Sequence, residues 1–265
     1  MNDQLSFTEL LGSLEQDADG NHHLTISDNW LQGRTTYGGL SAAICLQAVT
    51  VSHPDLPPLR SAQINFVGPV VDDISVTVKV MRQGRSVSYI SAEMFGQQGL
   101  VTQAVFCFGL SRESRLNKQF TDKPEVPSAE DSSHFFNSKM QPAFAKHYNC
   151  KLAKGGHPMT GSTESEHYIW VQHKDKNATD MVALLGIADM PPPAVMPMFE
   201  EFAPLSSMTW MLNFLTEDTS TDDGWWLMRS AAEHAVDGYS SQDMQVWNSN
   251  GDLVVSALQN VAIFY

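Results

Sequence analysis

The end of the chain, from Trp225 to Tyr265, limits the possible folds more than any other stretch. It divides into three β-type runs, separated by Asp237-Gly238 and by Asn250-Gly251. Asp-Gly and Asn-Gly pairs between such runs are strong signals for tight hairpin turns. The segment therefore predicts three consecutive antiparallel strands.

The last of these runs is apolar on one face apart from a single amide. Side chains alternate between the two faces of a strand, so one face carries Gln259 together with Val255, Ala257, Val261 and Ile263. A buried amide without partners costs about 1–3 kcal/mol. We therefore expect Gln259 either to be held by other protein groups or to hold a substrate or a water.

A segment in the middle of the chain repeats this last run. Residues 99–106 (GLVTQAVF) resemble 251–259 (GDLVVSALQ) once one residue is inserted after the glycine. Phe106 then matches Gln259. The repeat predicts two copies of one unit, with an apolar plug in the first copy where the second carries an amide.

The order of the remaining elements supports this duplication. The first half predicts a short leading helix, a strand, a long buried helix and four antiparallel strands, at residues 5–16, 22–26, 40–51, 60–67, 74–82, 86–95 and 100–110. The second half repeats the plan with a strand, a shorter helix and four strands, at residues 168–172, 180–188, 205–215, 225–232, 239–247 and 253–265. A helix wrapped by an antiparallel sheet in this order is the hotdog pattern. We therefore predict an α+β double hotdog.

We expect three regions along the chain. Residues 1–110 form the N-terminal hotdog, and residues 164–265 form the C-terminal one. The region 111–163 between them is polar with scattered prolines, which predicts a linker or excursion. Its three phenylalanines, Phe135, Phe136 and Phe144, are poor candidates for full exposure, so part of this region should pack against the body.

Charge and composition exclude several classes of function. The formal charge of −14 argues against nucleic acid or an anionic membrane as a partner, and the apolar runs are too short to span a bilayer. The N-terminus carries no pattern of a secretory signal. Three widely spaced cysteines, Cys45, Cys107 and Cys150, favour neither a disulfide framework nor a zinc site. We expect a cytoplasmic protein without a metal.

Several motifs in this order resemble the acyl-CoA thioesterase II-like, double-hotdog proteins. They are residues 33–39 (GRTTYGG), 82–86 (RQGRS), 205–210 (LSSMTW), 251–254 (GDLV) and 257–259 (ALQ). The resemblance implies that an Asp, a Thr and a Gln of the second hotdog position a water, which attacks the thioester carbonyl. Gln259 falls on that Gln, whereas Ser206 falls on the Asp and His234 on the Thr. Two of the three residues are therefore changed in this chain.

Thioester hydrolysis also needs an oxyanion donor and a base. In hotdog proteins a backbone N–H at the start of the central helix is the donor, which points to Gly39, although packing explains Gly38-Gly39 equally well. Candidate bases are His234, with an ordinary pKa near 6.5, and Asp189 at the end of the second helix. Tyr37 and Arg34, just before the first helix, are candidates for binding substrate.

The leading hypothesis is an acyl-CoA thioesterase that needs no cofactor beyond the coenzyme A of its substrate. A non-catalytic acyl-thioester-binding protein is the alternative, motivated by Ser206. A hydratase or dehydratase ranks last, because neither predicted helix carries the required Asp and His pair. Further association into a homodimer is compatible with the sequence.

Overall fold

The computed structural model describes residues 4–136 and 141–265. The first half begins with the short helix α1 (Phe7–Gly12). The other elements of this half are β1 (Glu15–Gln16), β2 (His22–Thr25), β3 (Leu31–Gln32), β4 (Thr35–Thr36), α2 (Gly38–Ser52), β5 (Leu59–Phe66), β6 (Asp73–Gln83), β7 (Val87–Gly96) and β8 (Gly99–Gly109).

The second half contains the strands β9 and β10 before its helix. Its elements are β9 (Ser133–His134), β10 (Tyr148–Lys154), β11 (Glu166–His173), α3 (Met181–Ala188), β12 (Leu205–Phe214), β13 (Trp225–Val236), β14 (Tyr239–Trp247) and β15 (Leu253–Ile263). The predicted strands and helices of both halves agree with these bounds to within a few residues.

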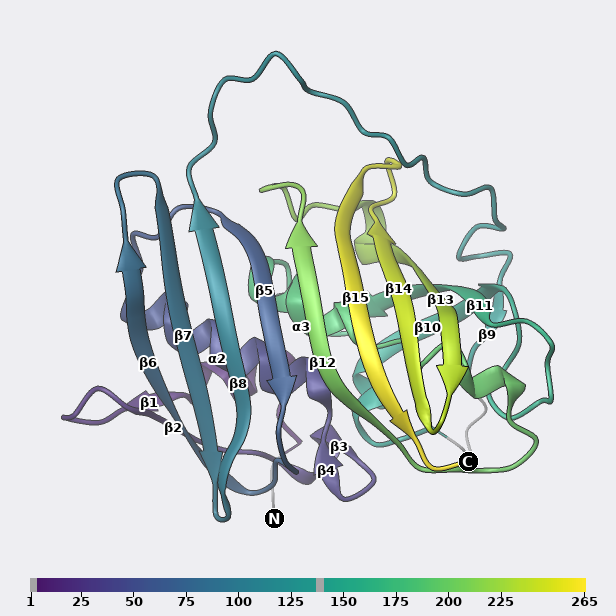
Figure 1. The fold of residues 1–265 in the computed structure, drawn as a ribbon, viewed down its shortest axis with the longest axis horizontal. Coiled ribbons are helices and arrows are strands. Elements are labelled where there is room, and N and C mark those ends of the chain that lie inside the picture. Colours follow the sequence, from purple (N-terminus) through teal and green to yellow (C-terminus); the bar gives the residue numbers. More distant parts are fainter. Residues whose placement is uncertain (1–3, 137–140) are drawn as a thin grey trace.

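One antiparallel sheet of 13 strands runs through both halves, in the order β1-β2-β6-β7-β8-β5-β12-β15-β14-β13-β11-β10-β9. The helices α2 and α3 lie together behind this sheet in Figure 1, so the sheet has an inner face toward the helices and an outer face. Among the described residues, no helix combines the length and apolar character that crossing a membrane would need.

The two halves are related by a pseudo-two-fold axis at the seam between β5 and β12. The strand order β2-β6-β7-β8-β5 is mirrored by β12-β15-β14-β13-β11 across this seam. At the seam Trp210 lies opposite Ile64, and Leu212 lies opposite Ala62. Both β6 and β13 contain a register shift at corresponding positions, after Val80 and after Ala232 respectively. The register therefore agrees with the repeat predicted from the sequence.

The central helices differ in length between the halves. Helix α2 has 15 residues and is buried along most of its surface, because small and apolar side chains fill nearly every turn. Helix α3 has only 8 residues, which agrees with the shorter helix predicted for the second half at residues 180–188. Asp180 caps its start through a hydrogen bond from the backbone N–H of Ala183. Asp189 ends it, immediately before Met190 and a run of prolines.

The region between the halves differs from the predicted linker. Residues 110–132 arch past the ends of the central strands, from β8 to the second half (Figure 1). Beyond the arch, β9 and β10 extend the sheet at its far edge. Phe135 and Phe144 are buried, as expected from their size, whereas residues 137–140 of the predicted linker lie outside the described residues.

Candidate active site

The carboxyl group of Asp189 lies at the meeting point of both helices and the last strand. Its Oδ1 accepts a hydrogen bond of 2.8 Å from Nε2 of Gln259 on β15. The backbone N–H of Gly39, at the start of α2, also stabilises the charged form of this carboxyl group. The structure therefore brings together Asp189, Gln259 and Gly39, three residues proposed from distant parts of the sequence.

A chain of amides extends from this carboxyl group across the inner face of the sheet. Nε2 of Gln242 on β14 donates to Oε1 of Gln259 at 2.6 Å, because the two residues lie directly opposite each other. Oε1 of Gln242 in turn accepts from the backbone N–H of Ala194 at 2.9 Å. Every donor in the chain points toward Asp189, so each hydrogen bond polarises the next one in the same sense. The side chain of Gln259 is thus fixed in orientation.

Burial raises the pKa of Asp189 to about 7 from its ordinary value of 3.8. The hydrogen bond from Gln259 and the backbone N–H of Gly39 lower the pKa, but their effect is weaker than that of desolvation. Although the residue as a whole keeps some exposure, its carboxyl group is enclosed by protein, and the enclosure of that group decides its pKa. A carboxylate that exchanges its proton near neutrality is suited to act as a general base.

The glycines at the start of α2 allow this close approach. A Cβ atom added to Gly38 would lie 2.8 Å from Oδ2 of Asp189, and one added to Gly39 would lie 2.3 Å from the carbonyl oxygen of Gly186 on α3. Both distances are too short for a real Cβ atom. The packing explanation for Gly38-Gly39 is therefore correct, and the same packing places a helix N-terminus against the carboxyl group of Asp189.

Tyr37 and Arg34 lie close to this point in the chain but have different surroundings. The hydroxyl group of Tyr37 donates to the carbonyl oxygen of Gly186 at 2.6 Å, and its buried ring stacks on Phe144. The structure thus gives Tyr37 a role in joining α2 to α3, in place of the predicted substrate contact. Arg34 is exposed in the turn between β3 and β4, so its role in binding substrate stays a prediction.

The structure does not place Ser206 or His234 with the other candidates. Both are exposed on the outer face of the sheet. An irregular register between Ser207 and Thr209 reverses the alternation of β12, and a similar one after Ala232 reverses that of β13. A one-residue bulge moves every following side chain to the opposite face. The site prediction must be corrected by removing these two residues.

Sequence reasoning missed two polar groups on the inner face. Gln242 shares a face of β14 with Met244 and Val246, so it carried the same signal as Gln259, an amide on a mostly apolar face. Trp210 lies directly opposite Gln259, and its buried indole N–H has no partner among the described residues. Trp210 thus places an unpartnered donor on the same face as the chain of amides.

The corresponding position in the first half is closed. Phe106 lies opposite Ala62 as Gln259 lies opposite Trp210, and both Phe106 and its neighbour Ile90 are buried. The pseudo-two-fold axis therefore relates Gln242 and Gln259 of the second half to Ile90 and Phe106 of the first half. A pair of amides in one half corresponds to a pair of apolar side chains in the other. The predicted apolar plug at Phe106 is observed.

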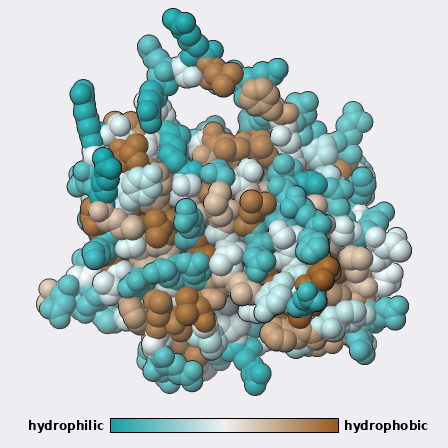
Figure 2. All heavy atoms as spheres, viewed as in Figure 1, coloured by the Kyte–Doolittle hydropathy of each residue, from teal (hydrophilic) through white to brown (hydrophobic). Residues whose placement is uncertain are grey.

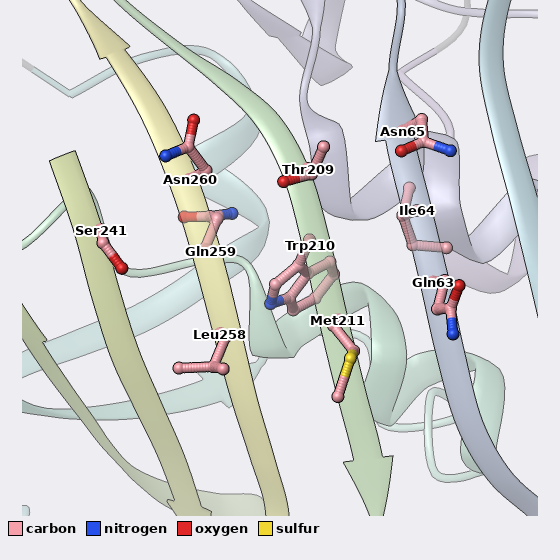
Figure 3. Close-up of a pocket in the computed structure, with 10 residues that line it drawn as sticks. All are labelled: Gln63, Ile64, Asn65, Thr209, Trp210, Met211, Ser241, Leu258, Gln259 and Asn260. Carbon is pink, nitrogen blue, oxygen red and sulfur yellow. The ribbon is translucent and has the colours of Figure 1, made fainter. Parts of the chain in front are cut away.

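A pocket of about 340 Å³ lies over the seam of the sheet, and its lining contains no charged residue but includes Gln259 and Trp210 of the candidate site. Figure 3 shows the side chains of Asn65, Thr209, Ser241 and Asn260 along its rim. These residues belong to the outer face, on which apolar and polar side chains alternate without one large apolar patch (Figure 2). Asp189 is not among the residues that line this pocket, so we do not assign the reaction to it.

Comparison with known proteins agrees with the fold. Among solved structures, a conserved protein of unknown function with a hot dog fold from Alicyclobacillus acidocaldarius matches with a TM-score of 0.88 and 23% identity, over 98% of each chain. A putative thioesterase II from Thermobifida fusca matches with a TM-score of 0.83 and 15% identity, over 98% of this chain and 97% of that one. An acyl-CoA thioesterase II from Mycobacterium marinum matches with a TM-score of 0.78 and 15% identity, over 98% of both. These likenesses establish the hotdog fold.

Two family models together cover nearly the whole described chain. The acyl-CoA thioesterase N-terminal domain matches residues 26–109, and the acyl-CoA thioesterase C-terminal domain matches residues 120–263. A search of curated protein sequences found no match. The resemblance seen in the sequence motifs is thereby confirmed, and the chain belongs to the acyl-CoA thioesterase family.

Proposed function

We propose that this protein is a double-hotdog enzyme that hydrolyses an acyl-CoA thioester with a water activated by Asp189. The observation that carries this proposal is the contact of 2.8 Å between Asp189 and Gln259, on a carboxyl group whose pKa is about 7. A general base works best when its pKa lies near the operating pH. Asp189 thus replaces the carboxylate that the family pattern led us to seek at Ser206.

The reaction divides into two steps. Asp189 takes a proton from the water while the water oxygen attacks the carbonyl carbon of the thioester, which gives a tetrahedral intermediate. The bond between carbon and sulfur then breaks, and the proton on Asp189 passes to the departing thiolate. The products are a free acid and coenzyme A, and the carboxylate is restored without any other cofactor.

Gln259 has the role of orienting the water in this scheme. Its Oε1 is occupied by Gln242 and its Nε2 by Asp189, so the amide cannot rotate to a different orientation without losing both hydrogen bonds. Fixed positioning of a reactant increases the rate, because little further rotational and translational entropy is lost at the reaction step. The start of α2 lies beside the same point, and its partial positive charge favours the oxyanion of the intermediate.

Release of free thiol from acyl-CoAs of short, medium and long chain tests this function. We expect turnover that falls about 10²-fold or more in Gln259→Leu. Gln63→Leu makes the same chemical change on the exposed outer face and serves as the matched control, with turnover unchanged. Tight binding of acyl-CoA with no thiol release from any member of the panel would favour the non-catalytic binding protein instead.

A further inference from the structure

Two adjacent polar side chains on the inner face have no role in the mechanism above. His167 on β11 lies directly opposite Ser230 on β13, and both residues are 0% exposed. Neither ring nitrogen of His167 nor the hydroxyl oxygen of Ser230 has a hydrogen-bond partner among the described residues. Each buried group without a partner costs about 1–3 kcal/mol. A folded chain rarely places three such atoms side by side unless something satisfies them.

The first half of the chain indicates that the fold itself does not need a polar side chain at the position of Ser230. Ser230 lies opposite Met244 on β14, and the pseudo-two-fold axis relates this pair to Val78 and Ala92 on β6 and β7. A valine therefore fills the corresponding place in the same architecture. Of the two corresponding positions, only the one in the second half, which also contains Asp189, carries a polar side chain.

Met244 connects this pair to the proposed reaction centre. It lies between Ser230 on one neighbouring strand and Ala257 on the other, and its Sδ is 3.5 Å from Nε2 of Gln242. Met190, which directly follows Asp189, is also buried on this side. Methionine side chains are flexible and can adapt to a guest. The row of Gln242, Met244, Ser230 and His167 gives the direction that an acyl chain extended from the reaction centre would follow.

The chemistry of the pair selects the group it would bind. Burial lowers the pKa of His167 to about 4, so its ring is neutral at physiological pH and offers one N–H donor and one acceptor nitrogen. The hydroxyl group of Ser230 also both donates and accepts. A charged group would lack a countercharge here, whereas an uncharged hydroxyl group satisfies both side chains at once.

We propose that His167 and Ser230 form a specificity subsite for a hydroxyl group carried on the acyl chain, distal to the thioester. This inference rests on the proposed thioester hydrolysis and names its substrate class. The enzyme then prefers a hydroxyacyl-CoA to the alkanoyl-CoA of the same length. A site built to hydrogen-bond a substrate hydroxyl discriminates strongly against the analogue that lacks it, because its own polar groups are then left unpaired.

The test compares saturated acyl-CoAs with isomers that carry one hydroxyl group at successive carbons. We expect one hydroxyl position to give a kcat/KM at least tenfold above that of the unsubstituted chain. Ser230→Val, which copies Val78 of the first half, should remove this preference while hydrolysis of the unsubstituted chain changes less than threefold. Ser240→Ala removes another buried serine without a described partner and is the matched control, with the preference retained.

The possible results distinguish a failure of the proposed subsite from a failure of the proposed hydrolase activity. Equal kcat/KM values for hydroxylated and unsubstituted chains at every position would overturn the subsite and leave the hydrolase proposal intact. An equal loss for all substrates in Ser230→Val would show a structural role instead, which thermal unfolding of the variant checks. If no acyl-CoA is hydrolysed, calorimetric titration tests the subsite through binding. Tenfold tighter binding of a hydroxyacyl-CoA than of the unsubstituted acyl-CoA, with the difference lost in Ser230→Val, supports the subsite. Equal binding of the two acyl-CoAs refutes it. A preference for an oxo group over a hydroxyl would overturn the assignment of the hydroxyl.

Discussion

Replacement of Asp189 by Asn should make the protein inactive and, at neutral pH, more stable. The exchange keeps the shape of the side chain and an oxygen for the hydrogen bond from Gln259 at 2.8 Å. It removes the group that we assign as general base. Loss of general base catalysis corresponds to a decrease of about 10²- to 10⁴-fold in kcat. Thiol release from the best acyl-CoA measures this effect.

The stability change follows from the pKa of the carboxyl group. Folding raises that pKa from 3.8 to about 7, so the folded state binds the proton more tightly than the unfolded state. The free energy of unfolding must therefore fall as pH rises from about 4 to about 7, and it stays level above that. At 1.36 kcal/mol per pKa unit, the total fall from this group is at most about 4 kcal/mol.

Asp189→Asn abolishes this penalty but replaces one carboxylate oxygen by an NH₂ group, so an acceptor near the backbone N–H of Gly39 is lost. That loss costs about 1 kcal/mol. At pH 8 we expect a net gain of up to about 3 kcal/mol, and at pH 4 a small loss. Urea unfolding at a series of pH values, for both proteins, gives the two curves.

Two results would refute this reasoning. A variant that retains more than a tenth of wild-type kcat excludes Asp189 as the base. Identical pH dependence of stability in both proteins would mean that another group titrates. In the wild type, kcat/KM should rise with pH and level off above about 7, because only the deprotonated carboxylate accepts a proton from water.

Three further substitutions test the limits of the site. Ser206→Ala and His234→Ala should each leave kcat within about twofold of the wild-type value, because both side chains lie on the outer face of the sheet. A tenfold loss of kcat in either variant would return that residue to the site. Gly39→Ala should lower the free energy of unfolding by about 3 kcal/mol, because the added Cβ meets the backbone of Gly186. Urea unfolding measures this change, and an unchanged urea midpoint would contradict the packing. Gln242→Leu should reduce kcat about tenfold, because it frees the amide of Gln259 to rotate. Thiol release measures this effect, and unchanged turnover would exclude a role for the chain of amides.

Local patterns in the sequence were sufficient for most of the fold. Turn residues such as Asp237-Gly238 separate the strands, and the apolar periodicity of residues 40–51 indicates a buried helix. The match of Phe106 to Gln259 predicted both the duplication and the closed counterpart of the site. These features are readable because each depends on neighbouring residues in the chain.

What the tertiary structure decided is which face each side chain occupies and what surrounds it. The bulges before Thr209 and after Ala232 send Ser206 and His234 outward, and alternation alone gives no sign of an inserted residue. The strands β9 and β10 also depend on a sheet edge formed by distant segments. No sequence pattern marks that edge.

Asp189 illustrates the same division. Its place before a proline run indicates the end of a helix, and the sequence by itself gives no more weight to it than to any turn aspartate. Its pKa depends on Gln259, 70 residues away, and on Gly39 in the other half. Desolvation and hydrogen bonding act through space, so only the packed structure brings this carboxyl group to a pKa suited to catalysis.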